Sequence, residues 1–150
     1  MQITTKLFGE IEVAEEKIIC FPSGIIGFPD MQKYLLIHDV EKNKKGISWL
    51  QSIEEPAFAM PVIDPLMLMQ EYNPMVEDEM LKVLGDLSPE EMLVLVTMTI
   101  PSDITKMTAN LKAPIIINAG NNTACQLIIE DDSYEVKHPV YEILKSKKEG

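Results

Sequence analysis

Apolar and polar residues alternate along most of the chain in short runs, which is the pattern of half-buried β-strands. Residues 1–8 and 10–13 alternate on either side of Gly9, and this arrangement predicts a β-hairpin. Turn-forming groups such as Pro22-Ser23-Gly24 separate the later runs. Further strands are predicted at residues 17–21, 34–38, 47–52, 58–63, 93–100, 114–118 and 124–129. Such spacing is typical of an antiparallel barrel or sandwich, and we expect a mainly β, barrel-like single domain over residues 1–150 with one or two short helices.

One segment breaks the β pattern. Apolar residues within 76–84 recur at helical spacing, and Gly85 follows as a terminator. The first turn of this segment holds Glu77, Asp78 and Glu79, whose negative charges favour the positive end of a helix dipole. A single helical turn is also predicted at residues 88–91, directly before a strand, and an irregular turn within 103–111.

The charge balance is strongly acidic. Thirteen lysines and no arginine stand against 24 aspartates and glutamates, which gives a formal net charge of −11. A nucleic-acid binder needs clustered positive charge to displace counterions from phosphates, so direct binding to nucleic acid is not expected. An anionic membrane surface would repel the chain as well. The acidity instead favours a basic protein partner, because opposite net charges speed encounter and favour the right complex.

Cysteine usage and the first residues of the chain indicate a cytoplasmic protein. Cys20 and Cys125 lie far apart in apolar runs, which is typical of buried free thiols in a reducing compartment. Residues 1–12 lack the basic start and apolar stretch of a signal peptide. The longest apolar stretch, residues 57–69, is interrupted by two prolines and an aspartate and is too short for a membrane span. We therefore expect neither secretion nor membrane insertion.

The sequence contains no recognisable catalytic or metal-binding motif. His38 and His138 have no metal ligands at suitable spacing, and Asp39 would face away from His38 on a strand. No nucleophile elbow, phosphate-binding loop, zinc-protease motif or paired-cysteine motif occurs. The neighbouring carboxylates Glu54 and Glu55 indicate a solvated turn more than a general acid and base. We expect no enzyme activity, no cofactor and no metal.

Ten methionines are a high count for this length. Met60, Met67 and Met69 fall in a stretch that prolines interrupt, and acidic residues follow at Glu71 and within 77–79. Methionine fills irregular cores, and it also lines adaptable binding surfaces. An apolar patch rimmed by acids suits a basic or amphipathic helix, whereas a methionine-rich core beside a solvated acidic face would produce the same pattern.

Several blocks of sequence occur in a distinctive order. They read FPSGIIGF at residues 21–28, WLQS at 49–52, EPAF at 55–58, PVIDP at 61–65 and TANLKAPIIIN at 108–118. Together they resemble the blocks of the flagellar assembly factor FliW family, which begin with F-x-x-G-[LI]-x-G-F and end with T-x-N-L-x-A-P-[IV]-x-[IV]-N. The resemblance singles out Phe21, Gly24, Gly27, Phe28, Asn110, Pro114 and Asn118 as family-motif residues. Many relatives carry basic residues after the last block, but this chain does not, so basic contacts there are not carried over.

The resemblance implies a cytoplasmic, non-enzymatic protein with two exchanging partners. It would bind flagellin before export and, once freed, would bind the translational regulator CsrA and relieve repression of flagellin mRNA. CsrA binding in the family is described as lying away from the RNA site, so the antagonism would be allosteric or electrostatic. In the absence of partners we expect a monomer.

We place the predicted contacts on the acidic and methionine-rich part of the chain. The hypothetical acidic rim for CsrA consists of Glu71, Glu77, Asp78, Glu79 and Asp103. The hypothetical flagellin surface lies in the apolar stretch and includes Phe58, Met60, Met67 and Met69. Two other interpretations stay open, namely an acidic chaperone or scaffold for another client and a small-ligand-binding β-barrel.

Overall fold

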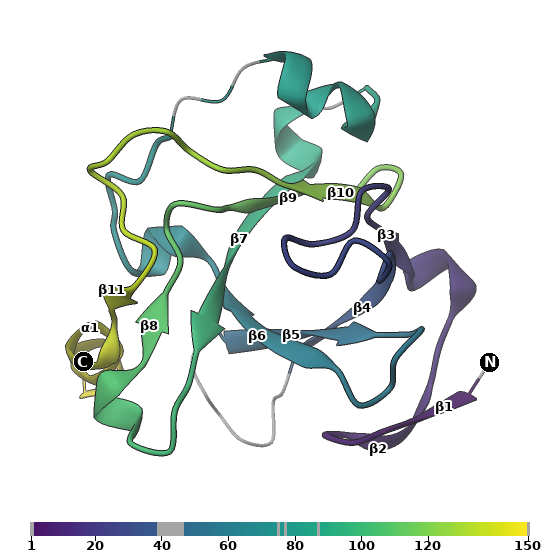
Figure 1. Cartoon of the computed structure of the whole chain (residues 1–150), viewed down its shortest axis with the longest axis horizontal. Helices are drawn as coiled ribbons and strands as arrows, with labels where there is room; N and C mark the ends of the chain where they lie inside the picture. Colours follow the sequence, from purple (N-terminus) through teal and green to yellow (C-terminus); the bar gives the residue numbers. More distant parts are fainter. Residues whose placement is uncertain (1, 39–46, 75, 77, 87, 150) are drawn as a thin grey trace.

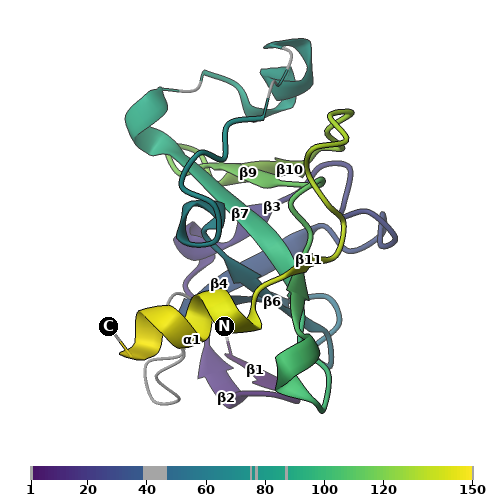
Figure 2. The same cartoon turned by 90° about the vertical axis from the view of Figure 1, so that its left-hand side faces the viewer.

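The computed structural model describes residues 2–38, 47–74, 76, 78–86 and 88–149, and its centre is a closed β-barrel (Figures 1 and 2). The seven barrel strands are β3 (Ile19–Cys20), β4 (Lys33–His38), β5 (Ile47–Ser52), β6 (Ala59–Ile63), β7 (Met92–Thr99), β9 (Ile115–Asn118) and β10 (Thr123–Gln126). They follow one another around the ring in the order β7-β6-β5-β4-β3-β10-β9, and pairing of β7 with β9 closes it. Six of the pairs are antiparallel, and β3 meets β10 in parallel through Cys20 and Thr123.

The mainly β, barrel-like fold predicted from the alternation is therefore confirmed. The predicted strand at residues 47–52 coincides with β5, and the other strand predictions differ from the observed bounds mainly at their ends. Beyond β10 the chain continues to pair less regularly. The amides of Leu127 and Ile129 donate to the carbonyl oxygens of Pro114 and Lys112, at 3.0 and 2.7 Å. The predicted alternation thus extends further than the regular strand.

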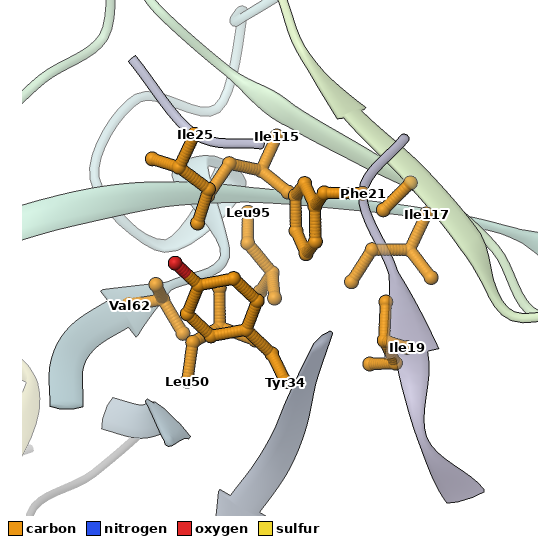
Figure 3. Close-up of a cluster of buried hydrophobic side chains, with 10 residues drawn as sticks. Ile19, Phe21, Ile25, Tyr34, Leu50, Val62, Leu95, Ile115 and Ile117 are labelled. Atoms are coloured by element: carbon orange, nitrogen blue, oxygen red, sulfur yellow. The ribbon is translucent and has the colours of Figure 1, made fainter. Parts of the chain in front are cut away.

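Apolar side chains from all around the ring fill the barrel interior (Figure 3). The buried interior cluster consists of Ile19, Phe21, Ile25, Tyr34, Leu50, Val62, Leu95, Ile115, Ile117 and Ala124. Phe21 and Tyr34 meet edge to face, with ring centroids 5.2 Å apart, which is a favoured aromatic geometry. Because these inward-pointing side chains pack against one another, the interior offers little support for a small-ligand-binding barrel.

The N-terminal hairpin lies outside the ring. β1 (Gln2–Thr5) pairs with β2 (Gly9–Glu12), as the alternation around Gly9 predicts. The ring of Phe8 packs edge to face on Trp49 of β5, with centroids 6.1 Å apart. The amide of Lys6 donates to the carbonyl oxygen of Pro56 at 3.2 Å. These contacts attach the hairpin to the outer face of the barrel.

The C-terminal part of the chain extends the sheet and covers another outer face. β8 (Thr108–Ala109) pairs with the end of β7, and β11 (His138–Pro139) pairs with β8. Helix α1 (Tyr141–Glu149) follows and packs Ile143 and Leu144 against buried residues on the outside of the barrel. The sequence did not predict β11 or α1, because a two-residue strand has no alternation and this helix is largely polar.

Within the described parts of the chain, five short 3-10 helices connect the strands. They are η1 (Glu15–Lys17), η2 (Pro65–Met67), η3 (Asp78–Leu84), η4 (Pro89–Glu91) and η5 (Ile104–Lys106). The helix predicted over residues 76–84 begins at Asp78 and is a 3-10 helix, and Gly85 ends it with a φ of 73°. The predicted single turn before β7 and the irregular turn near residue 103 correspond to η4 and η5.

Tyr34 is the exception within the apolar interior, because its hydroxyl is buried and has no hydrogen-bond partner among the residues that the structure describes. Burial, together with the nearby Glu54, raises the pKa of Tyr34 to about 12. A buried hydroxyl without a partner costs desolvation that no interaction repays.

We therefore predict that Tyr34→Phe is neutral or stabilises the fold by up to about 1 kcal/mol. Urea unfolding followed by circular dichroism measures this change. Tyr34→Ala is the control for loss of packing and is expected to destabilise by about 3–5 kcal/mol. A Tyr34→Phe variant destabilised by more than about 1 kcal/mol would show that the hydroxyl has a stabilising partner.

Candidate protein-binding groove

An apolar groove of about 470 Å³ lies on the outside of the barrel, between η2, η3 and the first half of β7. Its apolar lining includes Leu66, Tyr72, Val76, Leu81, Met92 and Leu93. Leu66 is 52% exposed, and Met92 and Leu93 are also exposed for large apolar residues. An exposed apolar groove of this kind is typical of a surface that another molecule covers.

A short proline turn forms one wall of the groove. Asp64 precedes η2, and its Oδ1 atom accepts a hydrogen bond of 2.9 Å from the amide of Leu66. Pro65 takes the first helical position, where its missing N–H costs nothing. Leu68 at the end of this turn is buried and anchors it. Leu66 is thereby held outward at the edge of the groove.

Two tyrosines fix the adjoining part of the groove. The hydroxyl of Tyr72 donates a 2.8 Å hydrogen bond to the carbonyl oxygen of Leu111. The rings of Tyr72 and Tyr134 meet edge to face at 4.9 Å, and the Tyr134 hydroxyl accepts from the amide of Asn73 at 3.2 Å. Burial raises the pKa of Tyr72 well above its usual range, so it remains neutral. This part of the groove is preorganised rather than formed by the partner.

Asparagine side chains hold the opposite wall. Asn118, at the end of β9, is buried and donates from Nδ2 to the carbonyl oxygens of Leu84 and Asp86, at 2.8 and 3.0 Å. Asn121 donates a second hydrogen bond to the Leu84 carbonyl oxygen, at 2.9 Å. The Leu84 side chain is itself buried against Ile116. The C-terminal end of η3 is therefore clamped to the barrel beside the start of β7.

The predicted acidic rim is divided by the structure. Glu71 is exposed next to the groove residue Tyr72, and Glu79 is exposed on η3, where it forms a 3.0 Å ion pair with Lys82. Asp78 is the first residue of η3, and Glu77 lies outside the described residues.

Asp103 does not belong to this rim. It caps η5, and its Oδ1 accepts from the Thr105 amide at 3.1 Å. The clamp on Leu84 places η3 near Met92, whereas Asp103 follows the far end of β7 at Thr99. An eight-residue strand spans about 26 Å, so β7 keeps the two sites apart (Figures 1 and 2). The prediction that all five acids form one rim is wrong for Asp103.

The predicted flagellin residues do not form one surface either. Phe58 and Met60 are half-buried against the interior cluster, whereas Met67 and Met69 are half-buried against the outer cluster beneath α1. The prolines and turns between them send successive segments to different faces of the barrel wall. Their methionines mainly fill the core, which was the alternative explanation for the pattern.

Comparison with known proteins identifies the family. The model of the FliW protein family matches residues 2–140. A flagellar assembly factor FliW of Lachnoclostridium phytofermentans is 50% identical over 148 residues, covering 98% of this chain and 95% of the relative. The chain belongs to the FliW family. A FliW of Lachnospira eligens is also 50% identical, over 98% of this chain and 99% of the relative.

A solved structure supports the same conclusion about the fold. The crystal structure of a flagellar assembly factor FliW matches this chain with a TM-score of 0.85 at 29% sequence identity. The match covers 94% of this chain and 97% of the other. This chain therefore shares its fold with that FliW structure over nearly its whole length.

The first FliW motif forms a tight loop across one end of the barrel. Phe21 is buried in the interior, and Gly24 has a φ of 68° that favours glycine. A Cβ on Gly24 would lie 2.5 Å from the Cα of Pro29, so no other residue fits without moving the backbone. Gly27 also has a positive φ, of 91°, and the Phe28 ring packs on Phe58 with centroids 4.6 Å apart.

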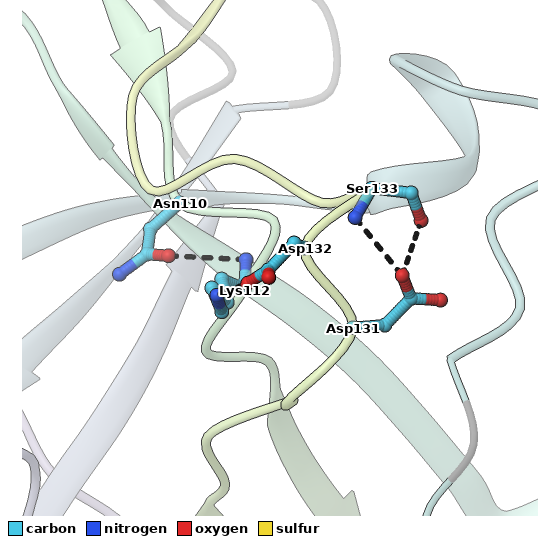
Figure 4. A network of polar contacts seen from close by, with 5 residues as sticks. All are labelled: Asn110, Lys112, Asp131, Asp132 and Ser133. Atoms are coloured by element: carbon cyan, nitrogen blue, oxygen red, sulfur yellow. Dashed lines mark hydrogen bonds and ion pairs between the residues drawn. The ribbon is translucent and has the colours of Figure 1, made fainter.

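The last FliW motif organises a connection and a strand. Asn110 Oδ1 accepts from the Lys112 amide at 3.1 Å, and the Lys112 ammonium pairs with Asp132 at 2.8 Å (Figure 4). In the same loop, the amide and hydroxyl of Ser133 donate to Asp131 and lower the pKa of that carboxyl. Pro114 is buried at the start of β9 and lines the groove.

Little in the described residues indicates catalytic chemistry. No cluster of three or more histidine, cysteine or acidic side chains in this part of the chain is arranged to hold a metal ion. Cys20 and Cys125 are free and half-buried rather than buried as predicted, and burial raises the pKa of Cys125 to about 11. None of the helices that the structure describes has the length and apolar character that a membrane crossing requires.

Sequence reasoning missed the exposed apolar residues of the groove. Leu93 was assigned to a predicted strand, where apolar residues normally indicate core, Met92 directly precedes that strand, and Leu66 was one member of an apolar stretch. The available signal was the polar turn before Leu66 and the acidic turn before Met92, which place both residues at element ends.

We predict that Asn118→Ala destabilises the fold by about 2 kcal/mol, because it removes a buried side chain that makes three hydrogen bonds, to the carbonyl oxygens of Leu84 and Asp86 and from the Gly120 amide. Asn121→Ala is the matched control, with an expected cost of about 1 kcal/mol, because Leu84 keeps its bond to Asn118. Urea unfolding of both variants tests the difference. Equal and small costs would mean that the clamp does not hold η3.

Proposed function

We propose that this FliW-family protein is a cytoplasmic, non-enzymatic partner switch. It binds flagellin before export, and when it is freed it binds CsrA and relieves repression of flagellin mRNA. It is a monomer when neither partner is bound. The observation that carries the proposal is the apolar groove, whose lining includes Asp64 and whose neighbours in the chain include the exposed Glu71 and Glu79.

The groove suits a segment of CsrA that is apolar on one side and basic at its margins. Leu66, Leu81 and Met92 supply apolar contact, and Asp64 lines the groove with a negative charge. The exposed Glu71 adjoins the groove residue Tyr72 in the chain, and the exposed Glu79, which is paired with Lys82, lies two residues from the groove residue Leu81. Apolar contact contributes most of the affinity in such complexes, and charge at the margin sets the association rate and the choice of partner.

Charge also explains how docking on CsrA would weaken the binding of RNA by CsrA. An RNA-binding regulator must present a basic surface to phosphates. A protein of net charge −11 docked beside that surface lowers its positive potential over about 8 Å at physiological salt. RNA binding would then weaken even where the two footprints do not overlap.

Reversing the charge at the edge of the groove tests the proposal. We expect Glu71→Lys/Glu79→Lys to bind CsrA about tenfold more weakly and with less salt dependence, because both side chains are exposed and adjoin groove-lining segments in the chain. The matched control is Glu10→Lys/Glu15→Lys, which changes the net charge equally at exposed positions on the hairpin and η1. Isothermal titration calorimetry with purified CsrA at two salt concentrations gives both quantities.

Equal effects of the two double variants would contradict a specific role for the groove. The partner switch is tested separately with the wild-type chain bound to immobilised CsrA. Addition of flagellin is expected to release the chain into solution. Stable retention of both partners on one chain would contradict the exchange.

A further inference from the structure

The first FliW motif exposes apolar side chains that are not part of the groove. Residues 21–31 turn back across the barrel end and bury Ile25 in the interior cluster, while Ile26 and Phe28 on either side of Gly27 point outward. Ile26 is 51% exposed and Phe28 is 40% exposed. Phe28, Ile26 and the half-buried Phe58 make up what we call the loop surface.

Several hydrogen bonds make the loop surface rigid. The amide of Phe28 donates to the Ile25 carbonyl oxygen at 2.7 Å, and the Ile25 amide donates back to Phe28 at 3.3 Å. The Ile26 amide donates to Oε1 of Gln126 at 2.9 Å, and the Met31 amide donates to the Phe28 carbonyl oxygen at 3.2 Å. Exposed apolar side chains on a preorganised turn lose little entropy on binding, which is the property of a binding anchor.

An aromatic stack connects this surface to the core. Tyr34, in the interior, faces Phe58 at a centroid distance of 6.5 Å, and Phe58 faces Phe28 at 4.6 Å. The Phe28 ring thus packs on Phe58 on its inner side, while its outer side is exposed to solvent. A partner that covers it gains apolar contact without reorganising the barrel.

We propose that the loop surface is a second docking surface, which takes the apolar face of an amphipathic helix. The amides of Ile25, Ile26 and Phe28 already donate hydrogen bonds within the protein, so they are not open to pair with an added strand. Glu54 lies beside the loop and accepts hydrogen bonds from the backbone amides of Gln32 and Lys33. Both Glu54 and the adjacent Glu55 are exposed. Their charge matches a helix with basic residues along one flank.

The occupant that fits is a terminal helix of flagellin, and this assignment rests on the proposed function. The loop and η2 lie on opposite sides of the barrel (Figure 2), so the loop surface is separate from the groove, and we assign a different partner to each. Gln126 joins the two surfaces, because its Nε2 donates at 3.1 Å to Ala113, the residue before the groove residue Pro114. The exchange therefore does not require overlapping footprints.

The variant Ile26→Asp tests the loop surface. We expect it to weaken binding of unassembled flagellin at least tenfold, because it places a charge where an apolar face must dock, and to change CsrA affinity by less than twofold. The matched control is Ile104→Asp on η5, where the isoleucine is equally exposed at 53% and the flagellin affinity is expected to stay unchanged. Titration calorimetry of the full chain with each partner measures these affinities, after thermal unfolding shows that each variant is folded.

The outcomes separate the two proposals. Wild-type flagellin affinity in Ile26→Asp, or an equal loss in Ile104→Asp, overturns the loop surface while leaving the partner switch intact. A larger loss for CsrA than for flagellin also overturns the assignment. Failure of the wild-type chain to bind flagellin contradicts the proposed function itself and this assignment with it. If Ile26→Asp does not fold, Ile26→Ala replaces it, with an expected loss of at least threefold for flagellin alone.

Discussion

Closure of the barrel by β7 is the constraint on which the rest of the structure depends. β7 pairs with β6 on one side and β9 on the other, and its far end also carries β8. Elsewhere in the ring, β3 and β10 meet through a single parallel residue pair, Cys20 and Thr123. Beside this pair, the Cys20 amide donates to the carbonyl oxygen of Asn122 at 2.8 Å. Once the ring is closed, its inside is filled with apolar side chains, and every binding feature must lie on the outside.

Side-chain amides and carboxylates, rather than long helices, hold the outer elements in place. Asn118 clamps η3, and Asp64 caps η2. Gln126 accepts a hydrogen bond from the loop of the first FliW motif, and Glu54 accepts hydrogen bonds from two backbone amides just after that loop. Each of these groups bonds to backbone that no strand partner reaches. The loops are consequently rigid enough to present exposed apolar side chains without collapsing onto the barrel.

The sequence predicted the repetitive parts of this fold well and the irregular parts poorly. Alternation located β5 and the hairpin because half-buried strands impose a period of two, and it predicted the barrel-like class from their spacing. It missed α1, since only Ile143 and Leu144 of its apolar face pack inward and the remainder is polar. Asp103 was grouped with Glu79 because the sequence carries no measure of the distance that β7 puts between them.

The same limit applies to the binding surfaces. The family motifs include Gly24 and Asn118, and the structure gives a reason for each. A side chain at Gly24 would clash with Pro29, and Asn118 donates a hydrogen bond to the Leu84 carbonyl oxygen. Exposure of Leu66 depends on how distant segments pack, which a local pattern does not encode. The apolar residues that line the groove come from η2, η3 and β7 and include Met92, but they include none of the predicted Met60, Met67 and Met69.

The central claim is that the acid-edged groove receives the basic partner. Hydrogen–deuterium exchange of the full chain with and without CsrA tests it most directly, because backbone amides report on the groove without any substitution. The account predicts new protection at residues 64–72, 78–84 and 92–94, with the hairpin at residues 2–12 unchanged. Protection confined to the hairpin or to α1, with none along the groove, would contradict it.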